Sequence, residues 1–381
     1  MVTRITFADK ITGLPILAIG NEGHDTAHHY MTAMTWLSDS RHLIVHTDID
    51  PGIVHTDIGL ETWTGNVVRV DSETGDAQVL EEGLTWGRGV VSCDDVLYLF
   101  NKNELYAIHV WSGERRTVCM LEANCTFLGP LSITNDGKML GVYWQEQMQG
   151  DQSSEVATRE TCWVIGTVNT ESGEVREVAR PLFDQPYPIA NHAMINPVDP
   201  DLLFYSHEGT TEHIPDRLWT VDARSGATQN IFPQKKDESG QHVEYVGHEI
   251  WAFDGSGLYF VKYPHSPDQP TGVFFVDKRG EWHDFINGDY KYWHVGISPD
   301  GRYAVADTQE PGISKIVLID TATKRSSLLC EQPCRGVHPG HPHPSFSPDS
   351  RKITFTFSDA HDVLWVGILD IGDCIQLGSD E

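Results

Sequence analysis

A short pattern recurs seven times along the chain and limits its fold more than any other feature. Each copy has an alternating β-type run, a turn centred on Asp or Asp-Gly, and a second β-rich run. The copies begin at Met34, Gly89, Leu131, Ala193, Glu249, Val295 and Pro344. Because such turn residues adopt positive φ easily, each copy predicts a tight β-hairpin.

A second hairpin follows most copies, as in NVVRVDSETGDAQVL, LWTVDARSGATQNIF and VFFVDKRGEWHDF. Two hairpins make a four-stranded antiparallel blade, and seven blades of about fifty residues account for the 381 residues. No segment keeps an apolar helical spacing, so helices should be scarce. The sequence therefore predicts an all-β, seven-bladed β-propeller that forms a single domain over residues 1–381.

Charge and cysteine content narrow the partners and the compartment. The net charge of -28 comes from 55 acidic and 27 basic residues, which disfavours nucleic acid and anionic membranes as partners. An anionic small substrate requires Arg and His to create a local positive field. The N-terminus does not resemble a signal peptide, no window resembles a membrane span, and the seven cysteines include no C-x-x-C pair. We expect a cytoplasmic protein, and the sequence indicates no particular oligomeric state.

Histidine recurs at one position of the repeat. When the copies are aligned on the turn Asp, the residue six positions upstream is often basic. This position holds Arg88, His248, His294 and His343, and His192 if a two-residue turn insertion is allowed, whereas Ala33 and Pro130 break the pattern. Since the first strand of each blade lines the channel of a propeller, we predict that these basic residues point into one funnel.

A second histidine cluster lies in GVHPGHPHPSF, which contains His338, His341 and His343. His341 and His343 are two residues apart and share one face of a strand. With His294 from the adjacent blade, four imidazoles could enclose a divalent cation. All-nitrogen ligation suits Zn, Ni, Mn or Fe, and the sequence does not choose among them.

A third group of polar residues lies in SHEGTTEHIPDRLW, after the second strand of the fourth copy. It contains His207, Glu208, His213 and Arg217. The guanidinium of Arg217 offers a two-pronged donor for a carboxylate. Taken one at a time, these residues are typical of ordinary loops.

Five stretches together resemble the oligogalacturonate lyase family, bacterial enzymes of pectin breakdown that fold as seven-bladed propellers. They are SHEG at Ser206, DRLW at Asp216, GHEIWAFDG at Gly247, HVGISPDGRYAVAD at His294 and HPHPSFSPD at His341. The resemblance covers about the last half of the chain, and the N-terminal half matches only in the style of its repeats.

The resemblance implies β-elimination of uronate oligomers with a manganese ion bound between the last two blades. The family's base falls on His248 and its essential arginine on Arg217. Its metal histidines fall on His294, His341 and His343. His338, which we also count as a metal ligand, stands where the family typically has Gln, so the metal preference stays open.

The chemistry is consistent with this resemblance. Removal of the C5 proton of a uronate requires stabilisation of charge on its carboxylate, which a cation and an Arg can provide, while a neutral His takes the proton. We predict that Arg88, His192 and His207 bind a small anionic oligosaccharide. Two alternatives remain: a non-catalytic propeller that binds a ligand or partner, and a lyase for a different uronate glycoside.

Overall fold

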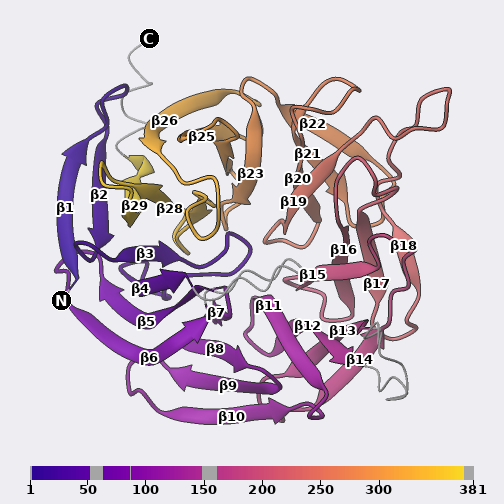
Figure 1. The fold of residues 1–381 in the computed structure, drawn as a ribbon, viewed down its shortest axis with the longest axis horizontal. Coiled ribbons are helices and arrows are strands. Elements are labelled where there is room, and N and C mark those ends of the chain that lie inside the picture. Colours follow the sequence, from indigo (N-terminus) through magenta and orange to yellow (C-terminus); the bar gives the residue numbers. More distant parts are fainter. Residues whose placement is uncertain (1, 52–62, 86, 148–160, 373–381) are drawn as a thin grey trace, which may run out of the picture. The chain divides into compact units, whose positions relative to one another are not determined.

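The computed structural model describes residues 2–51, 63–85, 87–147 and 161–372. They form seven antiparallel sheets, six with four strands and one with five (Figure 1). The fold is the predicted all-β, seven-bladed β-propeller. Within the described residues, no helix has the length and apolar character needed to cross a membrane.

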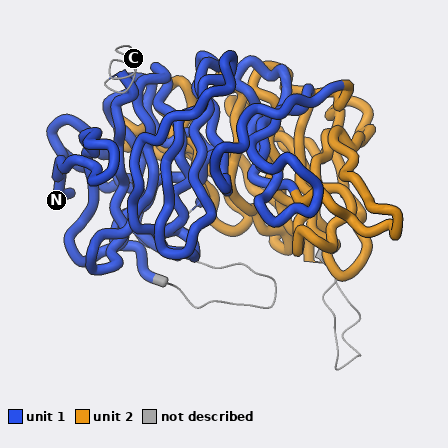
Figure 2. The backbone as a smooth tube through the Cα atoms, turned by 90° about the horizontal axis from the view of Figure 1, so that it is seen from above, with its two compact units in different colours: residues 1–87, 246–277, 282–381 blue, residues 88–245, 278–281 orange. Residues whose placement is uncertain are grey.

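The chain divides into two compact units (Figure 2). The first contains residues 1–87, 246–277 and 282–381, and the second contains residues 88–245 and 278–281. The first unit holds four of the seven sheets and the second holds three. That residues 1–381 behave as a single domain stays a prediction.

Three sheets of the first unit have four strands each, in chain order. Their strands are β3 (Asp25–His28), β4 (His42–Pro51), β5 (Trp63–Asp71) and β6 (Ala77–Thr85); β19 (Val246–Trp251), β20 (Gly257–Lys262), β21 (Gly272–Asp277) and β22 (His283–Asn287); and β23 (Tyr292–Ile297), β24 (Tyr303–Thr308), β25 (Ile313–Asp320) and β26 (Ser326–Pro333).

The fourth sheet of the first unit combines the two ends of the chain in the order β1-β2-β29-β28-β27. Its strands are β1 (Thr3–Ala8), β2 (Pro15–Gly20), β27 (Ser345–Phe346), β28 (Lys352–Ser358) and β29 (Leu364–Asp370). Strand β2 pairs with β29, with Ala18 opposite Gly367. The expectation of four strands in every blade is wrong here, because the N-terminal hairpin adds both of its strands to three from the C-terminal end.

The second unit contains three four-stranded sheets, and in each of them strands that are consecutive in the chain are neighbours. Their strands are β7 (Gly89–Val91), β8 (Val96–Asn101), β9 (Glu104–His109) and β10 (Arg115–Met120); β11 (Cys125–Ile133), β12 (Met139–Gln147), β13 (Thr161–Asn169) and β14 (Val175–Ala179); and β15 (Ile189–Ile195), β16 (Leu202–Glu208), β17 (Leu218–Asp222) and β18 (Thr228–Asn230).

Apolar side chains from strands that are buried along most of their length form the cores of both units. In the first unit Val305, Phe355 and Trp365 belong to one buried cluster that joins the β23–β26 sheet to the five-stranded sheet. In the second unit Ile165 and Leu203 belong to a cluster between the β11–β14 and β15–β18 sheets. Removal of these side chains from water is the main driving force for packing sheet on sheet.

The first strand of the β3–β6 sheet is interrupted. Strand β3 ends at His28, and pairing with β4 resumes only at an isolated bridge between Trp36 and Leu43. The repeat pattern placed Ala33 at the position that other copies give to His. The structure places Ala33 in the inserted loop and ends the paired strand with His28, followed directly by His29.

Candidate metal and catalytic centre

Three of the predicted histidines meet in the first unit, and irregular backbone brings them together. The pairing register shifts around His248 in β19 and around His294 in β23. His248 and His343 adopt left-handed φ angles of 56° and 46°. Bulges of this kind turn a side chain away from the direction that regular alternation gives it. The ring centre of His294 lies 4.0 Å from that of His248 and 4.3 Å from that of His343.

Three buried imidazoles form a group that could hold a metal ion. One nitrogen from each of His294, His341 and His343 lies within 4.8 Å of the others. Among the described residues, Nε2 of His294 and both ring nitrogens of His341 have no hydrogen-bond partner. Burial lowers the pKa of all three imidazoles. Because buried nitrogens without partners are costly and neutral imidazole is a good ligand, the group fits a divalent cation.

Asp307 fixes the orientation of His294. Nδ1 of His294 lies 2.8 Å and 3.0 Å from the two carboxylate oxygens, and the backbone N–H of His294 donates to the same carboxylate at 2.7 Å. The carboxylate is fully buried, and burial raises the pKa of Asp307 to about 7. Since the Nδ1 proton of His294 points to Asp307, its lone pair lies on Nε2, the nitrogen that belongs to the metal group.

Two further contacts hold the loop that carries His341 and His343. Nε2 of His28, at the end of β3, donates to the carbonyl oxygen of Pro342 at 3.0 Å. The backbone N–H of His343 points at Asp307, with 3.3 Å between N and Oδ2. Strands β3 and β24 therefore position a loop that has no regular strand of its own until Ser345.

His248 lies beside the metal group and has a defined tautomer. Its Nδ1 lies 2.5 Å from the carbonyl oxygen of Trp293 and 3.1 Å from the hydroxyl of Tyr263. A carbonyl oxygen can only accept, so Nδ1 carries a proton, and in the neutral form of the ring the lone pair lies on Nε2. A neutral imidazole with this tautomer is suited to accept a proton.

His338 lies next to the metal group without joining it. Its ring centre is 4.2 Å from that of His341 and 5.0 Å from that of His343, against which it stacks. Tyr30 packs against both His338 and His343. The role of His338 as a fourth ligand stays a prediction.

In the second unit, Arg217 forms a bidentate ion pair. Its two terminal nitrogens lie 2.8 Å and 2.9 Å from the carboxylate oxygens of Glu208, and only 4% of Arg217 is exposed. Burial alone would raise the pKa of Glu208, but the charge of Arg217 lowers it overall. Nε2 of His192 lies 3.9 Å from the same carboxylate. Glu208 thus joins two of the predicted site residues.

His207 is held by packing in the second unit. Its ring stacks on Phe183 at 3.8 Å, and Nε2 donates to the carbonyl oxygen of Tyr187 at 2.8 Å. Burial lowers the pKa of this imidazole. These contacts give His207 a clear structural role, and its binding of substrate stays a prediction.

Arg88, just before β7, lies with its guanidinium 5.2 Å from the ring centre of Phe100. Burial lowers the pKa of Arg88, although a guanidinium stays charged in proteins. No carboxylate in the described part of the chain forms an ion pair with it. A half-buried cation of this kind is suited to bind an anionic group.

The structure brings together the three predicted metal histidines and places His248 beside them, and their roles stay predictions. The sequence did not point to Asp307, His28 or Trp293, which contact these residues. The sequence contains one indication of the role of Asp307, because a carboxylate inside the apolar run YAVADT is unusual for a buried strand. The sequence contains no such indication for His28 or Trp293. His28 contacts the carbonyl oxygen of Pro342, and Trp293 contacts His248 through its own backbone carbonyl, and neither contact can be read from the sequence.

Fold and site together define a β-propeller with a buried histidine group suited to a divalent cation. Comparison with known proteins gives a consistent result. The chain shows distant but full-length homology to oligogalacturonate lyases, the family that its motifs resemble over about the last half of the chain. It is 23% identical over 383 residues to an oligogalacturonide lyase of Pectobacterium atrosepticum and 20% identical over 384 residues to an oligogalacturonate lyase of Dickeya dadantii, with 92% of each chain covered in both cases.

Solved structures give the same fold. An oligogalacturonate lyase in complex with manganese superimposes with a TM-score of 0.78 at 20% identity, covering 97% of this chain and 96% of that one. An oligogalacturonate lyase from Vibrio parahaemolyticus gives a TM-score of 0.77 at 20% identity, covering 97% of both chains. No family model matches the chain.

Proposed function

We propose that the protein is a lyase that cleaves uronate-containing oligosaccharides of the oligogalacturonate type by metal-assisted β-elimination. The observation that carries the proposal is the position of His248, the proposed base, whose ring centre lies 4.0 Å from that of a predicted metal ligand, His294. Full-length homology to oligogalacturonate lyases supports the same reaction.

The metal in this proposal is a divalent cation, with manganese expected because a homologous structure contains it. His294, His341 and His343 would hold it, with His338 as the predicted fourth ligand. A bound cation supplies positive charge that stabilises the enolate-like charge on the uronate carboxylate.

The chain's own residues perform the proton transfer. Nε2 of His248 accepts the C5 proton, the electron pair of the C5–H bond forms the C4–C5 double bond, and the C4–O bond breaks. The departing oxygen takes a proton from water, the imidazolium of His248 returns its proton to water, and the fragment that contains C5 has a 4,5-unsaturated uronate end. The carbonyl oxygen of Trp293 and the hydroxyl oxygen of Tyr263 lie on the Nδ1 side of His248, so the lone pair that accepts the C5 proton is the one on Nε2.

The cations of the second unit are assigned to substrate binding. Arg217 is proposed as the essential arginine and Arg88 as a carboxylate-binding residue, with His192 and His207 contributing further contacts. Because Arg217 already binds Glu208, contact with a substrate carboxylate requires that this carboxylate compete with Glu208 or share the guanidinium with it.

The proposal is tested with a panel of pectic, alginate and glucuronan oligomers, each with added manganese and with chelator. Ultraviolet absorbance of the unsaturated uronate should rise with oligogalacturonate and metal. A rise with only another oligomer would identify a different uronate glycoside as the substrate. No rise with any oligomer would contradict the lyase and favour a propeller that only binds a ligand or partner.

A further inference from the structure

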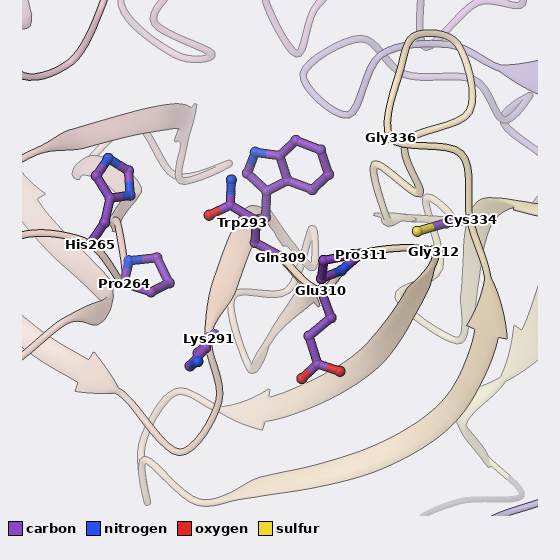
Figure 3. A pocket seen from close by; sticks show the side chains of 10 residues that line it. All are labelled: Pro264, His265, Lys291, Trp293, Gln309, Glu310, Pro311, Gly312, Cys334 and Gly336. Atoms are coloured by element: carbon purple, nitrogen blue, oxygen red, sulfur yellow. The ribbon is translucent and has the colours of Figure 1, made fainter.

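A pocket of about 450 Å³ opens in the first unit (Figure 3). Its walls come from the start of β23, the segment between β24 and β25, the segment after β20 and the loop that precedes β27. Pockets of this size accept ligands as large as a sugar unit. None of its lining residues was singled out as a site residue by the sequence.

Trp293 connects the pocket to the candidate centre. Its ring lines the pocket, and its ring centre lies 4.1 Å from that of His341 and 4.7 Å from that of His294. Its carbonyl oxygen accepts the Nδ1 proton of His248. A molecule that packs on the pocket side of Trp293 would therefore contact a residue that itself contacts both His248 and the metal group.

The polar residues of the pocket match an acidic sugar. Lys291 lies two residues before Trp293, and both side chains line the pocket. Lys291 is exposed, and it forms no ion pair within the described residues. The carboxylate of Glu310 is bound by Lys315 at 2.8 Å, which leaves Lys291 as a cation available to an anionic ligand.

A pyranose ring has an apolar face of C–H groups that packs on an aromatic ring, and its edge carries hydroxyls that need donors and acceptors. Trp293 supplies the aromatic ring. The exposed amide of Gln309 and the carboxylate of Glu310 supply a donor and acceptors beside it (Figure 3).

We propose that this pocket binds one uronate unit of the oligosaccharide, adjacent to the unit on which His248 acts. Trp293 stacks on the pyranose, Gln309 and Glu310 bind hydroxyls, and Lys291 binds the carboxylate. The assignment rests on the proposed lyase function for the identity of the neighbouring unit, whereas the recognition of an acidic sugar follows from the pocket alone.

The test measures binding by titration calorimetry in a His248→Ala background, with manganese present, so that the ligand is not cleaved. The probes are trigalacturonate and the neutral galactose trimer. Lys291→Gln should raise the Kd for trigalacturonate about fivefold and leave the Kd for the neutral trimer unchanged. Gln309→Ala should weaken binding of both. Lys10→Gln, an exposed lysine of the β1–β2 turn, is the matched control and should change neither.

The same variants in the active protein separate this assignment from the proposed function. Lys291→Gln should raise KM for trigalacturonate about fivefold with little change in kcat. If trigalacturonate is cleaved and Lys291→Gln changes neither KM nor Kd, the pocket assignment is overturned and the lyase stands. If nothing is cleaved but Lys291→Gln still weakens trigalacturonate binding, the lyase fails and the pocket is supported as an acidic-sugar site. Failure of the His248→Ala protein to bind trigalacturonate would overturn the assignment of this pocket as a uronate-binding site.

Discussion

The Nδ1 atom of His248 lies 2.5 Å from the carbonyl oxygen of Trp293, and this contact determines which nitrogen of His248 can act as a base. Since the carbonyl cannot donate, a proton stays on Nδ1, and in the neutral ring the lone pair is on Nε2. The bulge in β19, with its left-handed φ at His248, brings the ring to this carbonyl from the neighbouring sheet. The bulge at His248 therefore determines both where the ring lies and which of its nitrogens contacts the carbonyl oxygen of Trp293.

Replacement of His248 by Ala should lower turnover on the cleaved oligomer by about a hundredfold or more, the usual scale for loss of a general base. Metal content and thermal stability should barely change, because His248 is outside the group of three buried ligands. The exposed His361→Ala variant is the control and should keep full turnover. Near-normal turnover in His248→Ala would make the assignment of the base wrong.

The purified protein should contain about one divalent cation per chain, held by the three buried imidazoles. The double substitution His341→Ala, His343→Ala should abolish that content in elemental analysis and abolish activity. The fold should survive, because apolar packing between sheets supplies the core. Metal that remains bound in the double variant would place the cation elsewhere.

Replacement of Asp307 by Asn should weaken metal binding about tenfold to a hundredfold, measured by competition with a chelator. Asn can still accept the Nδ1 proton of His294 but no longer carries the charge that makes this imidazole a better ligand. Asp300→Asn, in the turn between β23 and β24, is the matched control and should keep parental affinity. Equal affinity in Asp307→Asn and the parent would show that Asp307 does not tune the site.

Replacement of His338 by Gln should shift the metal preference toward manganese and away from zinc or nickel, because an amide oxygen is a harder ligand than imidazole. Affinities for the three cations, measured side by side in the parent and the variant, provide the test. Parallel changes for all three metals would indicate that His338 acts only by packing against His343.

Stability should fall on the acid side of neutrality because of buried histidines near β3. Burial lowers the pKa of His29 to about 4, whereas in the unfolded chain it is near 6.5. Between these values the unfolded state binds the extra proton, so the free energy of unfolding decreases as the pH falls through this window, by up to about 3 kcal/mol for this group. Above about pH 6.5, His29 is neutral in both states, and its full contribution to the free energy of unfolding is present.

Urea unfolding at a series of pH values between about 7 and 4 measures this effect. His29→Gln should flatten the dependence, while the exposed His361→Gln should leave it as in the parent. An unfolding free energy that stays constant across the window in the parent would contradict the account of buried neutral imidazoles.

The propeller could be predicted because its determinants are local. Each Asp-centred turn specifies a hairpin, and the repetition of hairpins specifies blades. The five-stranded sheet could not be predicted in the same way, since the pairing of Ala18 with Gly367 joins residues at opposite ends of the chain. The interruption after His28 was not predicted, because the first copy was aligned on its turn Asp without an insertion, which put Ala33 at the position of the histidines.

The site was predictable to the extent that it depends on spacing. His341 and His343 are close in sequence, and His294 shares its place in the repeat with His343. The support of these rings was not predictable, because Asp307, the carbonyl of Trp293 and the contact from His28 to Pro342 depend on side-chain directions at bulges and loops. Local alternation does not specify those directions.

The central claim is elimination by His248, and mass spectrometry of the products combined with ultraviolet absorbance tests it most directly. Trigalacturonate treated with the manganese-loaded protein should give two fragments whose masses add up to that of the substrate, with absorbance from the new double bond, and His248→Ala should suppress both signals together. Fragments that together contain an added water and show no new absorbance would mean hydrolysis, and would contradict the account.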